Sequence, residues 1–471
     1  MSFQESWQLR AEFARRLSEM YGTEVPAYTT LVEVSEAVNR DFLHREGGEA
    51  ERLGSIDRVT AERHGAIRVG SPEELSQVAR VFAAFGMYPV GFYDLRDAAA
   101  SAVPVVSTAF RPTDATELAR NPFRVFTSML ATDDPRFFTA DQLHRLREFI
   151  SSRTLFPAEL LSLADRAAEA GGLAEKEAAN LLELATAAFE LSEDPVDHAW
   201  YRELEEVSAV AADIGGVSST HINHLTPRVL DIDDLYRRME DLGLAMIDEV
   251  QGPPDWRGPD VLLRQTSFRA LSEDRVFRFE DGTVGPGALR VRFGEVEQRG
   301  IALTPAGRAL YDRMVIDTDR RLRESGGVRT DVAREVWEEH LPDTEAGLLG
   351  QGLAYFTFEL SGPAPAVTGP VRISDLLDAG TVAASPIVYE DFLPRSAAGI
   401  FQSNLTGQGT KDAEQEGTPY DLTRLAEIMG RPIADPFQLY QHQVDASVAH
   451  LSEQLNTPVI NDTLKENADH V

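Results

Sequence analysis

The sequence contains no cysteine among its 471 residues. This absence excludes disulfide scaffolds, thiolate zinc sites, iron–sulfur clusters and cysteine nucleophiles. Any metal would therefore have to be bound by His, Asp or Glu side chains, which suit divalent first-row metals.

The sequence also lacks long apolar runs and an excess of basic charge. No stretch approaches the roughly 18 uninterrupted apolar residues that indicate a membrane-spanning helix. Residues 1–5 lack the basic start of a signal peptide, so we expect a cytoplasmic protein. Acidic residues outnumber basic ones by 77 to 45, which gives a formal net charge of −32. Such a surface repels phosphate backbones and anionic lipid, which argues against nucleic-acid and membrane partners.

Two similar octets stand out, HGAIRVGS at residues 64–71 and HLTPRVLD at residues 224–231. In each octet, Arg follows the His after four places, Val after five, and Ser or Asp after seven. A Leu stands eleven places after each His, at Leu75 and Leu235, inside a helical pattern. We interpret the pair as a duplicated module in which the two His residues hold equivalent positions.

Each octet begins a predicted strand that is followed by a helix and further strands. The first unit has strands at 63–69, 88–93, 103–110 and 123–129. Its helix begins at Ser71, a capping residue followed by Pro72, and runs to about residue 85. The second unit has a helix at 232–242 and strands at 224–230, 245–250, 261–268, 276–279 and 288–298, of which the last closes the unit.

The predicted fold class is α+β, with two βαβββ modules that form a central curved sheet or half-barrel. A chain of this length exceeds one hydrophobic core, so several regions are expected. We predict N-terminal helices with the first module at 1–134, a helical insertion at 135–215 and the second module at 216–303. Residues 304–471 are predicted to supply further helices, a strand and a pocket-lining loop.

The duplication predicts a metal site around His64 and His224. A third ligand is expected from the closing strand, where Glu295 and Glu297 have the same parity and face the same side. Burial of two carboxylates costs free energy unless positive charge is close by, and a metal together with Arg299 would provide it. Two His and one carboxylate leave open coordination positions, which suits non-haem Fe(II).

Arg68 is the candidate for a substrate contact. It lies four residues beyond His64 on the same strand face, about 13 Å along the strand. Its guanidinium could form a fork with the distal carboxylate of a short diacid. Arg228 repeats this spacing, but Pro227 is expected to bend its strand, so we rank it lower. His221 precedes His224 by three residues, which predicts the opposite face and a role in supporting the ligands or in the structure.

These residues resemble a known superfamily. The duplicated pattern resembles the βαβββ modules of the vicinal oxygen chelate superfamily. The stretch FGEVEQR at residues 293–299 is similar to the strand that carries the iron-ligand Glu in 4-hydroxyphenylpyruvate dioxygenases, and on that register Glu295 is the ligand. Several blocks also resemble the 2-oxoadipate dioxygenase/decarboxylase family, also called 2-hydroxyglutarate synthases, at residues 63–68, 221–228, 263–268, 294–300 and 389–401.

The resemblance implies Fe(II) on His64, His224 and Glu295, with Arg68 on the distal carboxylate of the substrate. It also implies contributions to the substrate pocket from Gln265, Arg395 and Ser396. Arg395 stands where the family usually has Val, so substrate preference could differ.

The implied reaction converts 2-oxoadipate and O2 to (R)-2-hydroxyglutarate and CO2, a step of lysine breakdown. Two alternatives stay open. One is another metalloenzyme of the same superfamily, such as a different 2-oxo acid dioxygenase or a lyase, and the other is a non-catalytic binding protein on this fold. The intact set of two His and one Glu argues against the second alternative.

Overall fold

A five-stranded sheet forms the centre of the molecule. The structure is a computed structural model. It describes residues 3–61, 63–97, 103–289, 292–364, 369–393, 411 and 417–464. The order of the strands in the sheet is β3-β4-β5-β2-β8. Their bounds are β2 (Arg63–Val69), β3 (Tyr88–Asp94), β4 (Val105–Arg111), β5 (Arg124–Leu130) and β8 (His224–Pro227). The strands predicted for the first unit are therefore confirmed.

The two modules meet where β2 pairs with β8. The pairing is antiparallel and sets His64 opposite Thr226, and Ala66 opposite His224. Beyond β8 the row continues to β12 (Glu295–Arg299) through a bridge between Arg228 and Glu297. β9 (Leu263–Ser267) then pairs antiparallel with β12. The start of each octet and the closing strand thus lie in one continuous row of strands.

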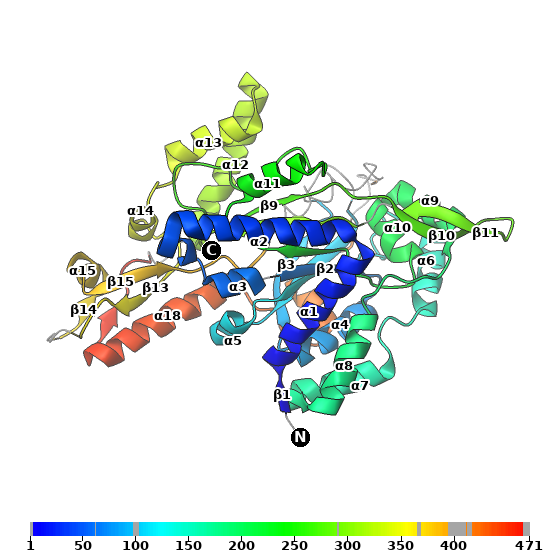
Figure 1. The fold of residues 1–471 in the computed structure, drawn as a ribbon, viewed down its shortest axis with the longest axis horizontal. Helices are drawn as coiled ribbons and strands as arrows, with labels where there is room; N and C mark the ends of the chain where they lie inside the picture. The colour runs from blue at the N-terminus through cyan, green and yellow to red at the C-terminus, as the bar shows by residue number, and fades with distance from the viewer. Residues whose placement is uncertain are drawn as a thin grey trace.

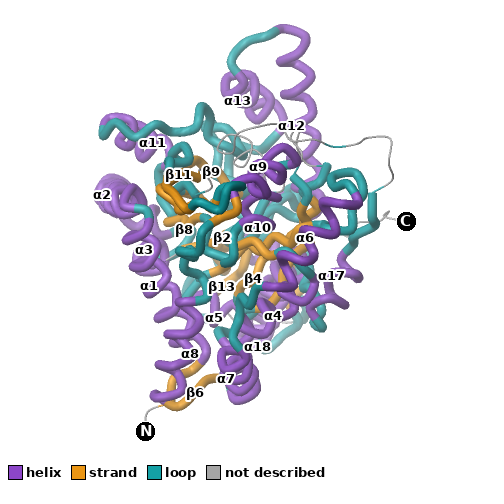
Figure 2. Tube along the Cα trace, turned by 90° about the vertical axis from the view of Figure 1, so that its right-hand side faces the viewer, coloured by secondary structure: helices purple, strands orange, loops and turns teal. Residues whose placement is uncertain are grey.

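The two faces of this row differ because side chains alternate along each strand. One face buries Ile67, Phe110 and Val296 in an apolar core. This core includes residues of α1 (Ser6–Glu24), α4 (Pro72–Ala84) and α7 (Ala158–Ala170). The opposite face carries His64, and the core on that side includes residues of α9 (His198–Val207) and α10 (Ala209–Gly216). Figure 2 shows the central strands enclosed by helices.

Residues 135–215, the predicted helical insertion, are mainly helical. They contain α6 (Ala140–Ser152), α7, α8 (Glu175–Ala187), α9 and α10, with the short strands β6 (Gly172–Ala174) and β7 (Val196–Asp197). β6 pairs with β1 (Phe3–Glu5), so the insertion also holds the N-terminal strand.

The second module departs from the predicted pattern. Residues 245–250 do not form a strand and make only an isolated bridge at Met246. The closing strand predicted at 288–298 is divided between β11 (Val284–Leu289) and β12. β11 pairs with β10 (Glu273–Arg278) in a hairpin beside β7, whereas β12 belongs to the central row of strands. This hairpin projects at the right of Figure 1. Most of its side chains are exposed or half-buried, so it has no continuous apolar face to cover.

The C-terminal region combines helices with two small sheets. The predicted helical stretch at 304–340 is two helices, since Gly326 and Gly327 adopt positive φ between them. No helix in the described part of the chain is long and apolar enough to cross a membrane. The other elements are α2 (Pro26–Glu46), α3 (Ile56–Ala61), α5 (Ala115–Arg120), α11 (Ile232–Asp241), α12 (Pro305–Ser325), α13 (Arg329–His340), α14 (Glu345–Gly350), β13 (Phe356–Leu360), β14 (Val371–Arg372), α15 (Ile373–Asp378), β15 (Val382–Pro386), α17 (Leu422–Met429), α18 (Pro436–Leu455) and β16 (Val459–Ile460).

The start of α4 gives a test of the local sequence signals. The Ser71 hydroxyl accepts a hydrogen bond from the Glu74 amide at 3.2 Å, and Pro72 occupies the first helical position. We expect Ser71→Ala to lower the free energy of unfolding by about 1 kcal/mol, because one amide of the first turn loses its acceptor. Denaturant unfolding would measure this loss. Ser71→Asp, which keeps an acceptor, should unfold close to the wild type, and equal losses in both variants would contradict the capping role.

Candidate metal centre

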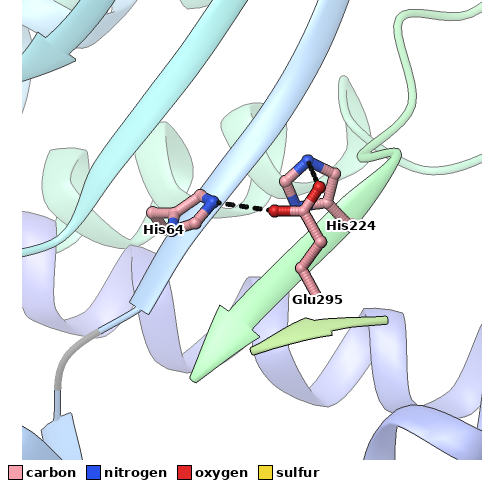
Figure 3. Close-up of side chains that lie close together, drawn as sticks. All are labelled: His64, His224 and Glu295. Atoms are coloured by element: carbon pink, nitrogen blue, oxygen red, sulfur yellow. Dashed lines mark ion pairs between the residues drawn. The ribbon is translucent and has the colours of Figure 1, made fainter. Parts of the chain in front are cut away.

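Three side chains converge on the face of the central row of strands that carries His64. His64 lies on β2, His224 is the first residue of β8, and Glu295 is the first residue of β12. They are 1%, 4% and 5% exposed. His64 Nε2 lies 3.5 Å from Glu295 Oε2, and His224 Nε2 lies 3.3 Å from Glu295 Oε1. Figure 3 shows both imidazoles directed at the carboxylate between them.

The donor atoms fit a divalent metal ion. One nitrogen or oxygen from each residue lies within 4.8 Å of the others. Bonds of about 2.0–2.2 Å from a metal to N and O donors hold neighbouring donor atoms about 3–3.5 Å apart, and the His64–Glu295 and His224–Glu295 atom pairs have this separation. Burial disfavours the charged ring and lowers the pKa of His224 to about 4, although Glu295 opposes this shift. The ring is therefore neutral near pH 7, as a ligand must be.

The other ring nitrogen of each His has a neighbour of its own. His224 Nδ1 lies 3.0 Å from the hydroxyl oxygen of Thr226. His64 Nδ1 lies 2.8 Å from Glu297 Oε2. Such contacts orient imidazole rings around a metal. Both rings thus have their Nε2 atoms directed toward Glu295.

Glu297 faces the same side as Glu295, as predicted, but has different partners. Arg299 donates to it twice, from Nε to Oε1 at 2.7 Å and from Nη2 to Oε2 at 2.9 Å. Burial alone would raise the pKa of Glu297, but Arg299 and His64 hold it well below the usual range. Glu297 is therefore an ionised carboxylate beside the triad, whereas Glu295 lies within it.

The predicted Gln265 contact also reaches the site. Its amide nitrogen lies 3.4 Å from Glu295 Oε2, in position to donate. Gln265 therefore contacts the carboxylate of the triad. Arg395 and Ser396 lie outside the described residues.

Arg68 is buried and forms an ion pair with Asp213 of α10. Asp213 also accepts a hydrogen bond from Asn223 Nδ2 at 3.0 Å, and His221 Nε2 lies 3.2 Å from its Oδ1. Burial favours a high pKa for Asp213, but His221 and Arg68 lower it well below the usual range. The charge of Arg68 in turn helps to lower the pKa of His224, so the two groups are within electrostatic reach.

Sequence reasoning missed Asp213 and misplaced His221. A carboxylate inside the apolar run of 209–217 was the available signal, since such a position requires a buried partner. The opposite-face argument for His221 assumed a regular strand, but β8 begins only at His224. Arg228, the lower-ranked copy of Arg68, is buried and donates to the carbonyl of Leu53 at 2.8 Å.

Aromatic rings close the site from two sides. The Phe392 ring meets the His64 ring edge-on with centroids 5.0 Å apart. The same ring lies 5.0 Å from Phe126. Phe293 stacks on His224 with centroids 5.4 Å apart. These apolar surfaces exclude water from the triad, which strengthens electrostatic interactions there.

Comparison with known proteins places the chain in a family. A family model described as 2-oxoadipate dioxygenase/decarboxylase matches residues 13–404. A 2-oxoadipate dioxygenase/decarboxylase of Mycobacterium tuberculosis is 56% identical over 441 residues, 93% of this chain and 96% of the relative. A relative of the same description from Escherichia coli is 39% identical over 454 residues, 93% of this chain and 97% of the relative. The chain belongs to the 2-oxoadipate dioxygenase/decarboxylase family.

A solved structure of this family has the same fold. The hydroxyglutarate synthase of Pseudomonas putida in complex with 2-oxoadipate matches with a TM-score of 0.82 and 36% identity. The match covers 97% of this chain and 100% of that one. Both the family resemblance and the α+β fold expected from the sequence are thereby confirmed.

The triad predicts how metal binding responds to substitution. We expect His224→Ala and Glu295→Gln each to lose stoichiometric metal, because two remaining donors hold a divalent ion poorly. Elemental analysis after reconstitution with Fe(II) under argon would measure this. His144→Ala, which removes an exposed His of α6, serves as the control. Retention of a full equivalent of metal by the two site variants would contradict the assignment.

Proposed function

We propose that this protein converts 2-oxoadipate and O2 to (R)-2-hydroxyglutarate and CO2, with Fe(II) on His64, His224 and Glu295. The main support for the proposal is the buried triad. It occurs in a chain whose relatives are named 2-oxoadipate dioxygenase/decarboxylase. The two reactants contain all atoms of the two products, so the reaction needs no further co-substrate. We assign the activity to lysine breakdown on the family resemblance.

Fe(II) bound at the triad would supply a redox-active centre with open positions for a 2-oxo acid and O2. The residues of the chain determine where these reactants lie. Glu295 and the two imidazoles occupy one side of the site, and Phe293 and Phe392 pack against the rings. The substrate head group must therefore approach from the remaining side, along the face of the sheet.

Arg68 is proposed to bind the distal carboxylate of the substrate. It lies on the same strand face as His64, about 13 Å further along β2. An Arg side chain that reaches back covers about half of this distance, and a six-carbon diacid spans roughly the remaining 6 Å. The metal position and Arg68 are thus spaced to hold both ends of a 2-oxo diacid, which would fix its chain over the reacting centre.

Two serines extend the polar surface beside Arg68. Ser128 of β5 is the register partner of Arg68, and Ser107 of β4 is the register partner of Ser128. Their buried hydroxyl oxygens lie 2.8 Å apart. Directly opposed residues share a face of the sheet, so these hydroxyls are placed to accompany Arg68 in binding a carboxylate.

The activity can be tested directly. The protein reconstituted anaerobically with Fe(II) should consume O2 when 2-oxoadipate is added and release one CO2 per O2. Chiral chromatography should identify the other product as (R)-2-hydroxyglutarate. Protein loaded with Zn(II), which has no redox chemistry, should consume no O2. An Fe(II)-loaded sample without substrate-dependent O2 uptake would rule the proposal out.

The role of Arg68 makes a separate prediction. Arg68→Ala should raise KM for 2-oxoadipate about 10- to 100-fold, since a hydrogen bond to a charged group contributes about 1.5–3 kcal/mol. Its kcat should fall less. A 2-oxo acid of equal length without the distal carboxylate should react alike with both enzymes. Steady-state O2 uptake with both substrates measures these effects, and an unchanged KM for 2-oxoadipate would remove Arg68 from the substrate site.

A further inference from the structure

We propose that Glu297 is a positioning residue, whose carboxylate, fixed by Arg299, holds the His64 ring with Nε2 toward the metal. This inference rests on the proposed metal site and adds a residue that binds neither metal nor substrate. It also gives separate functions to Glu295 and Glu297, the two carboxylates that face the same side of β12.

The carboxylate of Glu297 is fixed by contacts at both oxygens. Oε1 accepts from Arg299 Nε at 2.7 Å, and Oε2 accepts from Arg299 Nη2 at 2.9 Å. Oε2 also lies 2.8 Å from His64 Nδ1. The carbonyl of Glu297 accepts from the Val229 amide at 2.8 Å, which holds its backbone against the second octet. Glu297 and Arg299 are 0% and 1% exposed, so water does not compete for these contacts.

This contact matters because a neutral imidazole carries its proton on only one nitrogen. Arg299 donates to both oxygens of Glu297, so this carboxylate faces His64 Nδ1 as an acceptor and electrostatically favours the form of His64 that is protonated there. The lone pair then lies on Nε2, the atom 3.5 Å from Glu295. The edge of the Phe392 ring packs against the same imidazole and restricts its rotation. His64 is thus prepared as a ligand by its neighbours.

Arg299 keeps Glu297 from acting as a second anionic ligand. The fork neutralises Glu297, so Glu295 remains the carboxylate directed at both Nε2 atoms. Arg299 Nη1 also donates to the carbonyls of Tyr389 at 2.8 Å and Asp391 at 3.1 Å. Its guanidinium lies over the Phe392 ring, 5.7 Å from the centroid. The pair therefore connects His64 to the segment that carries Phe392.

A purely structural role for Glu297, as the neutralising partner of Arg299, makes a different prediction. Its loss would then lower stability without changing the affinity of the folded protein for metal. The chain offers a matched control in Glu74, which forms the same kind of fork with Arg153 at 2.7 and 2.8 Å. That pair contacts none of the three triad residues, so Glu74→Gln reports the cost of breaking a buried fork alone.

The test is anaerobic titration of the metal-free protein with Co(II), followed by the visible spectrum of the bound ion. Glu297→Gln should weaken Co(II) binding about 10- to 100-fold, the range typical for loss of such an orienting partner. Its Co(II) spectrum should also change. Glu74→Gln should bind like the wild type. Equal affinity of Glu297→Gln and wild type would overturn the proposal, as would complete loss of binding in Glu297→Gln, which would make Glu297 a ligand.

If Glu297→Gln does not fold, the double variant Glu297→Gln/Arg299→Gln removes both charges and leaves no unpaired charge in the interior. The same weakening is expected there, and wild-type affinity in that variant overturns the proposal. Failure of the proposed function gives another pattern, because the wild type would then bind no Co(II), or Glu295→Gln would bind it normally.

Discussion

The structure of the site depends on how two buried carboxylates on one face of β12 are compensated. Transfer of an ionised carboxylate from water into a protein interior costs several kcal/mol unless opposite charge and hydrogen bonds replace the water. Glu297 meets this requirement with Arg299, a partner on the same strand. Glu295 faces the Nε2 atoms of His64 and His224, and a fork from Arg is absent from its described contacts. A divalent cation is the compensation that this difference calls for.

The duplication explains why the imidazoles can share one cation. In the register of the antiparallel strands β2 and β8, His224 pairs with Ala66 and not with His64. The two rings are therefore offset along the strands, with centroids 5.4 Å apart and planes at 89°. Glu295 enters from the closing strand, and its carboxylate lies within 3.5 Å of both Nε2 atoms.

The sequence alone predicted those parts of the site that follow from the duplication and from the alternation of side chains along a strand. The two octets predicted His64 and His224 at equivalent strand positions, and strand parity placed Glu295 and Glu297 on one side. Parity could not assign their roles, because both positions share a face, and the difference lies in which atoms each contacts. The sequence also could not identify the partner of Arg68, since Asp213 lies 145 positions along the chain from it. The second module was overpredicted because alternating sequence does not show which strands pair.

Asp213 also gives the helical insertion a role in the site. A guanidinium kept ready for a substrate carboxylate would be a buried charge before the substrate binds, and such a charge is strongly destabilising without a partner. Asp213 supplies that partner from α10, and it is itself held by Asn223, the residue before His224. A guanidinium has five N–H donors, so one Arg can bind a protein carboxylate and a substrate carboxylate together. The insertion thus stabilises the buried charge of Arg68 at the position where we propose that the substrate carboxylate binds.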